Sequence, residues 1–159
     1  MWFRKVKACI LPLVAAAITS AAGFVSAADI EYVFPALVST IQEMTELQQR
    51  ETIDKLKGKS IEGEGELRDV GECSKYSSTK KWRKQGCYEI TVKSNAPRAG
   101  WSYADDIVMY MSKSEKNKLL SLDKGSQIRF KSCTILSVEK RGSFDKWWRI
   151  ECDAPTLFN

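Results

Sequence analysis

The chain has 159 residues, with 25 Lys and Arg, 20 Asp and Glu and no histidine, and a formal net charge of +5. The lack of histidine excludes imidazole metal sites and catalysis by Ser–His–Asp or Cys–His groups. We therefore expect a protein that is not an enzyme and needs no cofactor or metal.

Residues 1–27 have the pattern of a cleaved secretory signal peptide. Arg4, Lys5 and Lys7 precede an uncharged run over residues 8–28, and small residues ending at Ala27 suit a signal peptidase. An uncleaved anchor helix is the alternative, because the run approaches the ~20 residues that span a bilayer. The pattern predicts a bacterial protein exported to the periplasm or secreted, without stable membrane insertion after cleavage.

Removal of residues 1–27 would leave 132 residues with 22 basic and 20 acidic side chains, so the mature chain would carry only +2. Charge is instead local. Residues 73–87 contain five basic side chains and no acid, whereas residues 59–72 contain five acids. Only local patches can therefore be considered as binding surfaces.

Four cysteines remain after removal of residues 1–27. An even number predicts two disulfides in an exported chain, and the cysteines lack the CxxC spacing of a zinc site.

An N-terminal helical segment is expected over residues 28–57. Apolar residues recur at helical spacing after Pro35, and Gly58 suits the helix end. A break is expected near Thr52. The apolar stripe of this helix, which we expect to pack on the core of the domain, consists of Leu37, Ile41, Met44 and Leu47.

Residues 58–159 are expected to form a β-barrel domain. Residues 59–70 alternate with period two, which indicates a strand, and Gly63 and Gly65 on its apolar face indicate a bulge or a sharp bend. Glu62, Glu64 and Glu66 lie on the other face. They are expected to be solvated or to balance the lysine-rich loop, rather than to bind a metal ion.

The remaining elements follow in chain order. Strands are expected over residues 87–94, 107–111, 126–140 and 146–153, with a loop over 94–106. A helix is expected over residues 112–125, with a capping-box spacing between Ser112 and Glu115 and a stop at Gly125.

The last two strands suggest a disulfide pairing. Gly142 and Ser143 suit a two-residue hairpin turn, which would pair residues whose numbers sum to 285. Cys133 would then lie opposite Cys152, close enough for a disulfide. Cys73 and Cys87 are left to form the second bond. The same register would place Ile135 opposite Ile150, and Leu136 opposite Arg149.

The order of elements indicates a mainly β fold: a five-stranded OB-fold Greek-key barrel, with a helix between strands 3 and 4 and the N-terminal helix packed on it. The runs LKGKSIEGEGELRDV and DDIVMYMSKSEKNKLLSLDKGSQIRFKSCTI resemble the bacterial OB-fold families of the tRNA-anticodon-binding-like type. The matches are at residues 57–59, at Gly63 or Gly65, and at residues 122–126. The chain departs from that pattern at the long 73–87 loop and at Ser132-Cys133. The resemblance implies a fold, supplies no catalytic residue and leaves the ligand open.

The candidate site is the basic aromatic loop 73–87, where an OB fold commonly meets its ligand. We expect it to bind an anionic ligand: an oligonucleotide, an acidic glycan or an acidic protein surface. Two alternatives remain: a solvated loop closed by a disulfide, and an envelope or secreted protein-interaction or structural subunit, including a toxin-like glycan-binding subunit. Asp105-Asp106 is the adjacent acid pair that an enzyme could use for catalysis. A junction between structural elements explains the pair equally well. The candidate ligand-binding residues are Tyr76, Lys80, Lys81, Trp82, Arg83 and Lys84, extended by Arg98, Trp101 and Tyr103 of the next loop.

Overall fold

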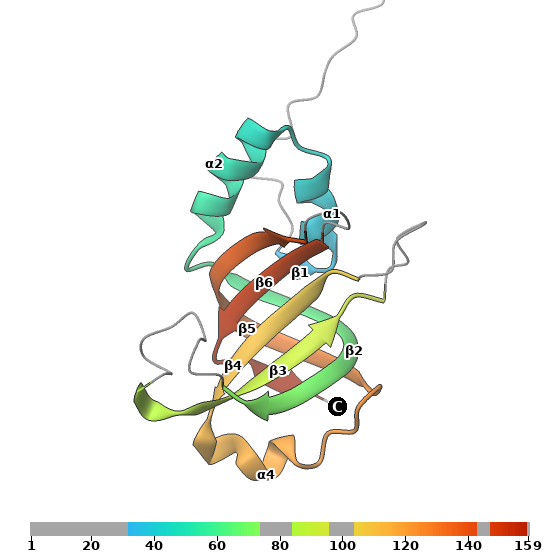
Figure 1. Cartoon of the computed structure of the whole chain (residues 1–159), viewed down its shortest axis with the longest axis vertical. Coiled ribbons are helices and arrows are strands. Elements are labelled where there is room, and N and C mark those ends of the chain that lie inside the picture. The colour runs from blue at the N-terminus through green and yellow to red at the C-terminus, as the bar shows by residue number, and fades with distance from the viewer. Residues whose placement is uncertain (1–31, 74–83, 96–103, 143–146, 159) are drawn as a thin grey trace, which may run out of the picture.

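The computed structural model describes residues 32–73, 84–95, 104–142 and 147–158 (Figure 1). The predicted signal peptide and its cleavage site lie outside these ranges. No helix within the described ranges is long and apolar enough to cross a bilayer. The elements are β1 (Val33–Phe34), α1 (Ala36–Gln42), α2 (Glu46–Leu56), β2 (Ser60–Glu72), β3 (Cys87–Lys93), β4 (Asp106–Ser112), the 3-10 helix η2 (Lys113–Glu115), α4 (Lys116–Leu119), β5 (Gln127–Arg141), β6 (Trp147–Asp153) and β7 (Thr156–Phe158).

Five strands form a closed barrel in the order β2-β3-β4-β6-β5, and β5 pairs with β2 to close it. The neighbours are antiparallel except for β4 and β6, which are parallel. This order, with helical residues between β4 and β5, is that of an OB-fold Greek-key barrel, so the predicted fold class is confirmed. Helices α1 and α2 stand at one end of the barrel and α4 at the other (Figure 1).

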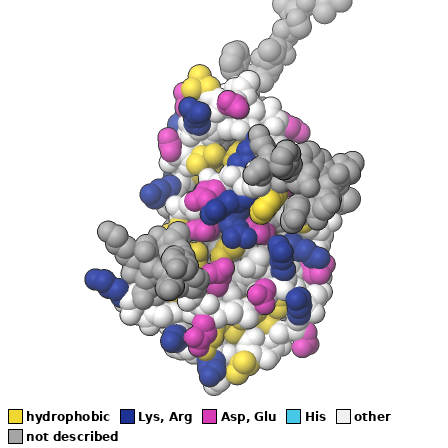
Figure 2. All heavy atoms as spheres, viewed as in Figure 1, with side chains coloured by type: hydrophobic (Ala, Val, Ile, Leu, Met, Phe, Trp, Pro, Cys, Tyr) yellow, Lys and Arg dark blue, Asp and Glu magenta, His cyan; other side chains and the backbone are white. Residues whose placement is uncertain are grey.

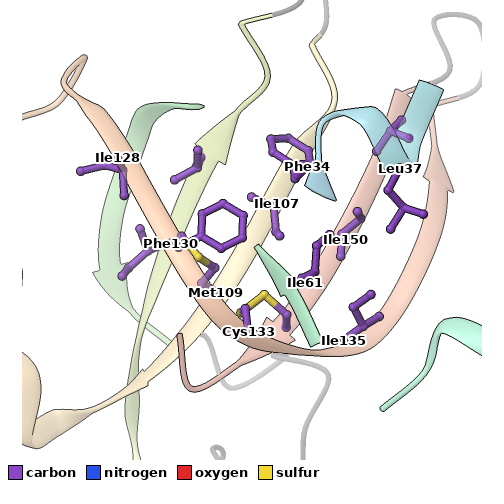
Figure 3. Packing of buried hydrophobic residues seen from close by; sticks show 14 of the residues in the cluster. Phe34, Leu37, Ile61, Ile107, Met109, Ile128, Phe130, Cys133, Ile135 and Ile150 are labelled. Atoms are coloured by element: carbon purple, nitrogen blue, oxygen red, sulfur yellow. A yellow bond between two sulfur atoms is a disulfide. The ribbon is translucent and has the colours of Figure 1, made fainter. Parts of the chain in front are cut away.

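The core fills the barrel with alternate residues of each strand, and Figure 3 shows them converging from opposite walls. Period-two alternation in β2 is confirmed, because Ile61 and Leu67 are buried and the glutamates between them face outward. β2 has a bulge between Ile61 and Gly63 and another between Leu67 and Asp69. The interpretation of the glycines as markers of a bent, bulged strand is therefore confirmed.

The two glycines on the inner face of β2 allow close backbone approach. A Cβ atom on Gly65 would lie 2.4 Å from the carbonyl oxygen of Lys93, and one on Gly63 would lie 2.4 Å from that of Phe34. Any side chain at either position would push β2 away from its neighbour, so glycine is required by the packing.

The N-terminal segment packs on the core as expected, but it contains two helices rather than one. α1 buries Leu37, which belongs to the core cluster. The chain then breaks at Thr45, whose side chain and that of Gln48 form a reciprocal capping box that starts α2. Leu47 consequently leaves the predicted stripe and is 69% exposed. The break expected near Thr52 was wrong, because Thr52 lies inside α2. The T-x-x-Q spacing of Thr45 and Gln48 was the available signal.

The helix predicted over residues 112–125 is much shorter than expected. Ser112 accepts a hydrogen bond from the backbone N–H of Ser114, which starts the single turn of η2. α4 then ends at Leu119, and Leu120 is exposed. Gly125 has a φ of +89° in a turn that enters β5, rather than ending a long helix.

Both predicted disulfides are present, but the hairpin register used to derive one of them was wrong. Cys133 and Cys152 are bonded, with their Cα atoms 5.5 Å apart. In the observed register Ile135 lies opposite Cys152, and a bulge follows before Ser137. The expected pairing of Ile135 with Ile150 is wrong.

The position of the turn explains this difference. Arg141 pairs with Trp147, so the connection covers residues 142–146 instead of a two-residue turn at Gly142-Ser143. Leu136 therefore does not lie opposite Arg149, which pairs with Glu139. The two cysteines are diagonal neighbours on the core face, where their side chains still meet.

Two short strands were not predicted. β1 runs parallel to β2 and pairs at Glu62 and Gly63, whereas β7 is antiparallel to β5 and pairs at residues 129–131. Each adds to an edge that the barrel strands leave open over part of their length. β1 and β7 thus flank the barrel strands β2 and β5, and the four strands form one surface on the outside of the barrel.

Candidate ligand-binding surface

The basic loop starts and ends at one point of the barrel. The Cys73–Cys87 disulfide holds the two Cα atoms 5.3 Å apart, and the N–H of Cys73 donates to the carbonyl oxygen of Cys87 at 2.9 Å. Cys73 follows the end of β2 and Cys87 begins β3. The loop therefore leaves from a stem that is held by one covalent bond and one hydrogen bond.

A second basic element lies beside this stem. Cys87 pairs with Ser112 of β4, which places η2 next to the loop. A Cβ atom on Gly86 would lie 2.5 Å from Cε and 2.9 Å from Nζ of Lys113, so the Lys113 side chain lies across Gly86. Lys84 and Lys113 are both exposed. Sequence reasoning missed Lys113, because only the β3–β4 register brings it to the loop.

Among the predicted ligand-binding residues, the structure places Lys84 alone. It is exposed at the stem, as a ligand-contacting lysine must be. The other candidates fall outside the described residues: Tyr76, Lys80, Lys81, Trp82 and Arg83 of the loop, and Arg98, Trp101 and Tyr103 of the next connection.

The outer face of β3, β4 and β6 holds a partly buried ion pair. Arg149 donates from Nε and one terminal nitrogen to the two carboxylate oxygens of Asp106, at 2.9 and 2.8 Å. Asp106 is fully buried, and the hydrogen bonds to it raise the pKa of Arg149 above its ordinary value. A guanidinium held by two parallel bonds has a fixed orientation. The two hydrogen bonds therefore hold the Arg149 side chain against Asp106 on the outer face of the sheet.

Further acids surround this ion pair. Burial raises the pKa of Glu89 above its ordinary value of 4.5, an effect that Arg149 opposes and that Glu151, Asp69 and Asp106 reinforce. This face is where OB folds commonly bind oligonucleotides. In the described residues it holds several carboxylates, and two arginines, Arg68 and Arg149, lie beside the same one, Asp106. Figure 2, viewed from the same side, shows acidic and basic side chains interspersed over these strands instead of one basic field. This part of the face therefore does not suit a polyanion.

The adjacent acids Asp105 and Asp106 have different structural partners. Asp105 accepts a hydrogen bond from the backbone N–H of Trp148 at 2.7 Å and another from Nε2 of Gln42 at 3.2 Å. Asp105 thus joins α1 to β6, whereas Asp106 pairs with Arg149. Through these contacts, both acids have a structural role in the fold.

Two of the three glutamates on the outer face of β2 pair with neighbouring strands. Glu64 binds Arg129 of β5 at 3.0 Å, and Glu66 binds Lys93 of β3 at 2.9 Å. In the described part of the chain, no group of three or more His, Cys, Asp or Glu is placed to hold a metal ion. Glu64 and Glu66 are thus partly solvated and paired across strands, and loop residues 74–83, which they were expected to balance, lie outside the described residues.

The fold and the clamped loop define the class of this protein as an OB-fold barrel. The chain matches no protein-family model, and no curated protein is significantly similar to it.

Proposed function

We propose that this protein is an exported, non-catalytic OB-fold binding module that holds an anionic ligand at loop 73–87. The ligand would be an oligonucleotide, an acidic glycan or an acidic protein surface. The observation that carries the proposal is the disulfide-clamped stem at one end of an OB barrel, where Lys113 of η2 lies across Gly86 and Lys84 of the loop is exposed.

The charge distribution supports this location. The 73–87 segment carries five basic side chains, and its stem adds Lys113. The acids on the outer face of β3, β4 and β6 would repel a polyanion from the middle of the sheet and favour the stem. The disulfide also removes loop freedom before binding, which reduces the entropy that a ligand must offset.

Export is part of the proposal. The N-terminal pattern of residues 1–27 supports it, and so do the two disulfides, which persist in oxidising compartments such as the periplasm.

A protein-interaction or structural subunit is the second candidate function. The acid-rich outer face of β3, β4 and β6 favours it, because a basic protein surface would complement that face. The two candidates differ in where the partner contacts the barrel and in the sign of the charges that it presents.

Salt-dependent binding tests the proposal. The purified protein, with both disulfides formed, is titrated with a single-stranded oligonucleotide and with a heparin-like glycan at several salt concentrations. Affinity should fall linearly on a log–log scale, with a slope of about −0.7 per phosphate contact for a single strand. Reversal of two contacting lysines, in K84E/K113E, should therefore flatten that slope by about 1.4.

A matched control uses two exposed lysines at the opposite end of the barrel. K55E/K57E changes the net charge equally, but at the end of α2, which lies at the other end of the barrel from α4 in Figure 1, and η2 directly precedes α4. The proposal requires normal binding by this control and weakened binding by K84E/K113E. Equal losses in both variants would indicate a response to net charge alone. Failure of the unmodified protein to bind either polyanion would overturn the proposal, and salt-insensitive capture of a basic protein would support the second candidate.

A further inference from the structure

The four strands β1, β2, β5 and β7 present a groove on the outside of the barrel, away from the loop stem. It has a volume of about 540 Å³. Its floor includes the backbone around Gly63 and Phe130, which pair across β2 and β5. Lys84 and Lys113 do not line it. The groove is therefore separate from the site proposed above.

The side chains that face outward here form a regular pattern across the strands. Two glutamates lie on β2 and two basic residues on β5, and apolar side chains lie at both margins, on β1 and β7. Register and alternation set this order. The groove-lining side chains on this outer face are Val33 and Pro35, then Glu62 and Glu64, then Arg129 and Lys131, and last Phe158.

These groups are open to solvent. Phe158 is 45% exposed, although its neighbour Leu157 is buried in the core. The side chains of Arg129 and Glu64 are 74% and 59% exposed, even though they form an ion pair across β2 and β5. Exposed aromatic side chains are enriched at protein interfaces, and stripes of opposite charge can pair with a surface of complementary charge.

We propose that this face binds a second copy of the chain. Consider a two-fold axis that lies between two such faces and runs parallel to the strands. It places β2 of one copy over β5 of the other, and β1 over β7. Glu64 of each copy then faces Arg129 of the other, and Glu62 faces Lys131. Phe158 lies against Pro35 of the facing copy, so the apolar margins also meet.

The charge pattern selects this arrangement among the face-to-face two-folds. An axis perpendicular to the strands would place β2 over β2, with glutamates against glutamates, and β5 over β5. Like charges in such a contact are unfavourable. A closed two-fold dimer requires a self-complementary surface, and an apolar, acidic, basic, apolar order is self-complementary about the first axis alone.

The dimer should be weak. Stable interfaces use about 20–30 residues a side, and the side chains around this groove are far fewer. We expect a dissociation constant in the micromolar range or above, which is measurable by sedimentation at about 1 µM to 1 mM. The stem with Lys84 and Lys113 would stay open in such a dimer.

Two opposite charge variants test the arrangement. E62K/E64K makes both stripes basic, and R129E/K131E makes both acidic. Each variant alone should be monomeric over the concentration range in which the unmodified protein dimerises. An equimolar mixture should form a heterodimer, because each stripe then faces its opposite. Formation of that heterodimer also shows that both variants are folded. F158A, which leaves every charge in place, should weaken the dimer at least about tenfold.

The proposal would be overturned by a monomeric unmodified protein at about 1 mM, by a dimer that the charge variants leave unchanged, or by variants that fail to associate when mixed. A monomer would leave the groove to a different protein. Dimerisation that depends on the 73–87 loop instead of this face would also contradict it.

Discussion

Substitution of Gly65 by alanine should destabilise the barrel more than its small size suggests. The new Cβ atom would lie 2.4 Å from the carbonyl oxygen of Lys93 and 2.6 Å from Cγ1 of Val92. Real Cβ atoms keep at least 3.0 Å from such neighbours, so β2 and β3 must separate by at least the difference, 0.6 Å. β2 cannot move freely, because Glu66 next to Gly65 pairs with both β3 and β5.

The expected cost is about 2–3 kcal/mol, in the upper part of the range for overpacked core positions. This is a large share of the ~5–15 kcal/mol of a whole domain. The measurement is urea unfolding followed by tryptophan fluorescence, with both disulfides intact. The free energy of unfolding should fall without a change in the dependence on urea concentration.

Gly71, on the same strand, is the matched control. A Cβ atom there would meet nothing within 4 Å. Gly71→Ala should be neutral or stabilising by about 0.4–1 kcal/mol, because alanine restricts the unfolded chain. If Gly65→Ala were as stable as Gly71→Ala, the explanation of Gly65 by close strand approach would be refuted.

Three further predictions concern buried and half-buried groups. Asp106→Asn should lower the free energy of unfolding by about 2–3 kcal/mol. This is less than the ~3–5 kcal/mol of a fully buried pair, because the side chain of Arg149 is 29% exposed and can regain water. Thermal unfolding measures the loss of stability, and no loss would contradict a structural role for Asp106. Burial raises the pKa of Glu89 in the folded state, so the native carboxyl disfavours folding increasingly as pH rises through that pKa. Glu89→Gln should therefore stabilise the protein near neutral pH and lose this advantage below the ordinary pKa of 4.5, and a gain that is independent of pH would exclude the carboxyl as its cause. Replacement of both Cys133 and Cys152 by alanine should lower the free energy of unfolding by about 3 kcal/mol, the chain entropy of a loop of roughly 20 residues. The space left in the core adds to this loss. Denaturant unfolding of the variant and the unmodified protein tests this, and an unchanged midpoint would contradict it.

Local patterns predicted most of the barrel. Alternation identified β2, β3 and β5, because one face of each strand is largely buried and the other is not. β4 was expected from a short apolar run instead, and it is buried on both faces. The glycines at 63 and 65 correctly indicated where β2 bends. The order of elements then allowed one familiar topology, and the parallel β4–β6 pair is the feature that completes it.

Errors arose where distant contacts outweigh local preference. The repeat through Leu47 resembles a continuous helix, but the capping box at Thr45 starts a new helix. The register of β5 and β6 depends on the bulge after Ile135 and on a connection over residues 142–146, neither of which a turn motif specifies. β1 and β7 are too short to show a pattern, and they form only because β2 and β5 offer open edges.

The sequence by itself determined the period of the alternating strands, the presence of two disulfides and the basic charge of residues 73–87, because these depend on residue type and spacing. The strand register decided how Cys133 meets Cys152. The tertiary structure alone brought Lys113 to the loop stem and seated Arg149 on Asp106. It alone also aligned two glutamates with two basic residues across β2 and β5. These arrangements depend on strand register and barrel closure, which join residues far apart in the chain. A site assembled from several strands therefore has no local signal in any one of them.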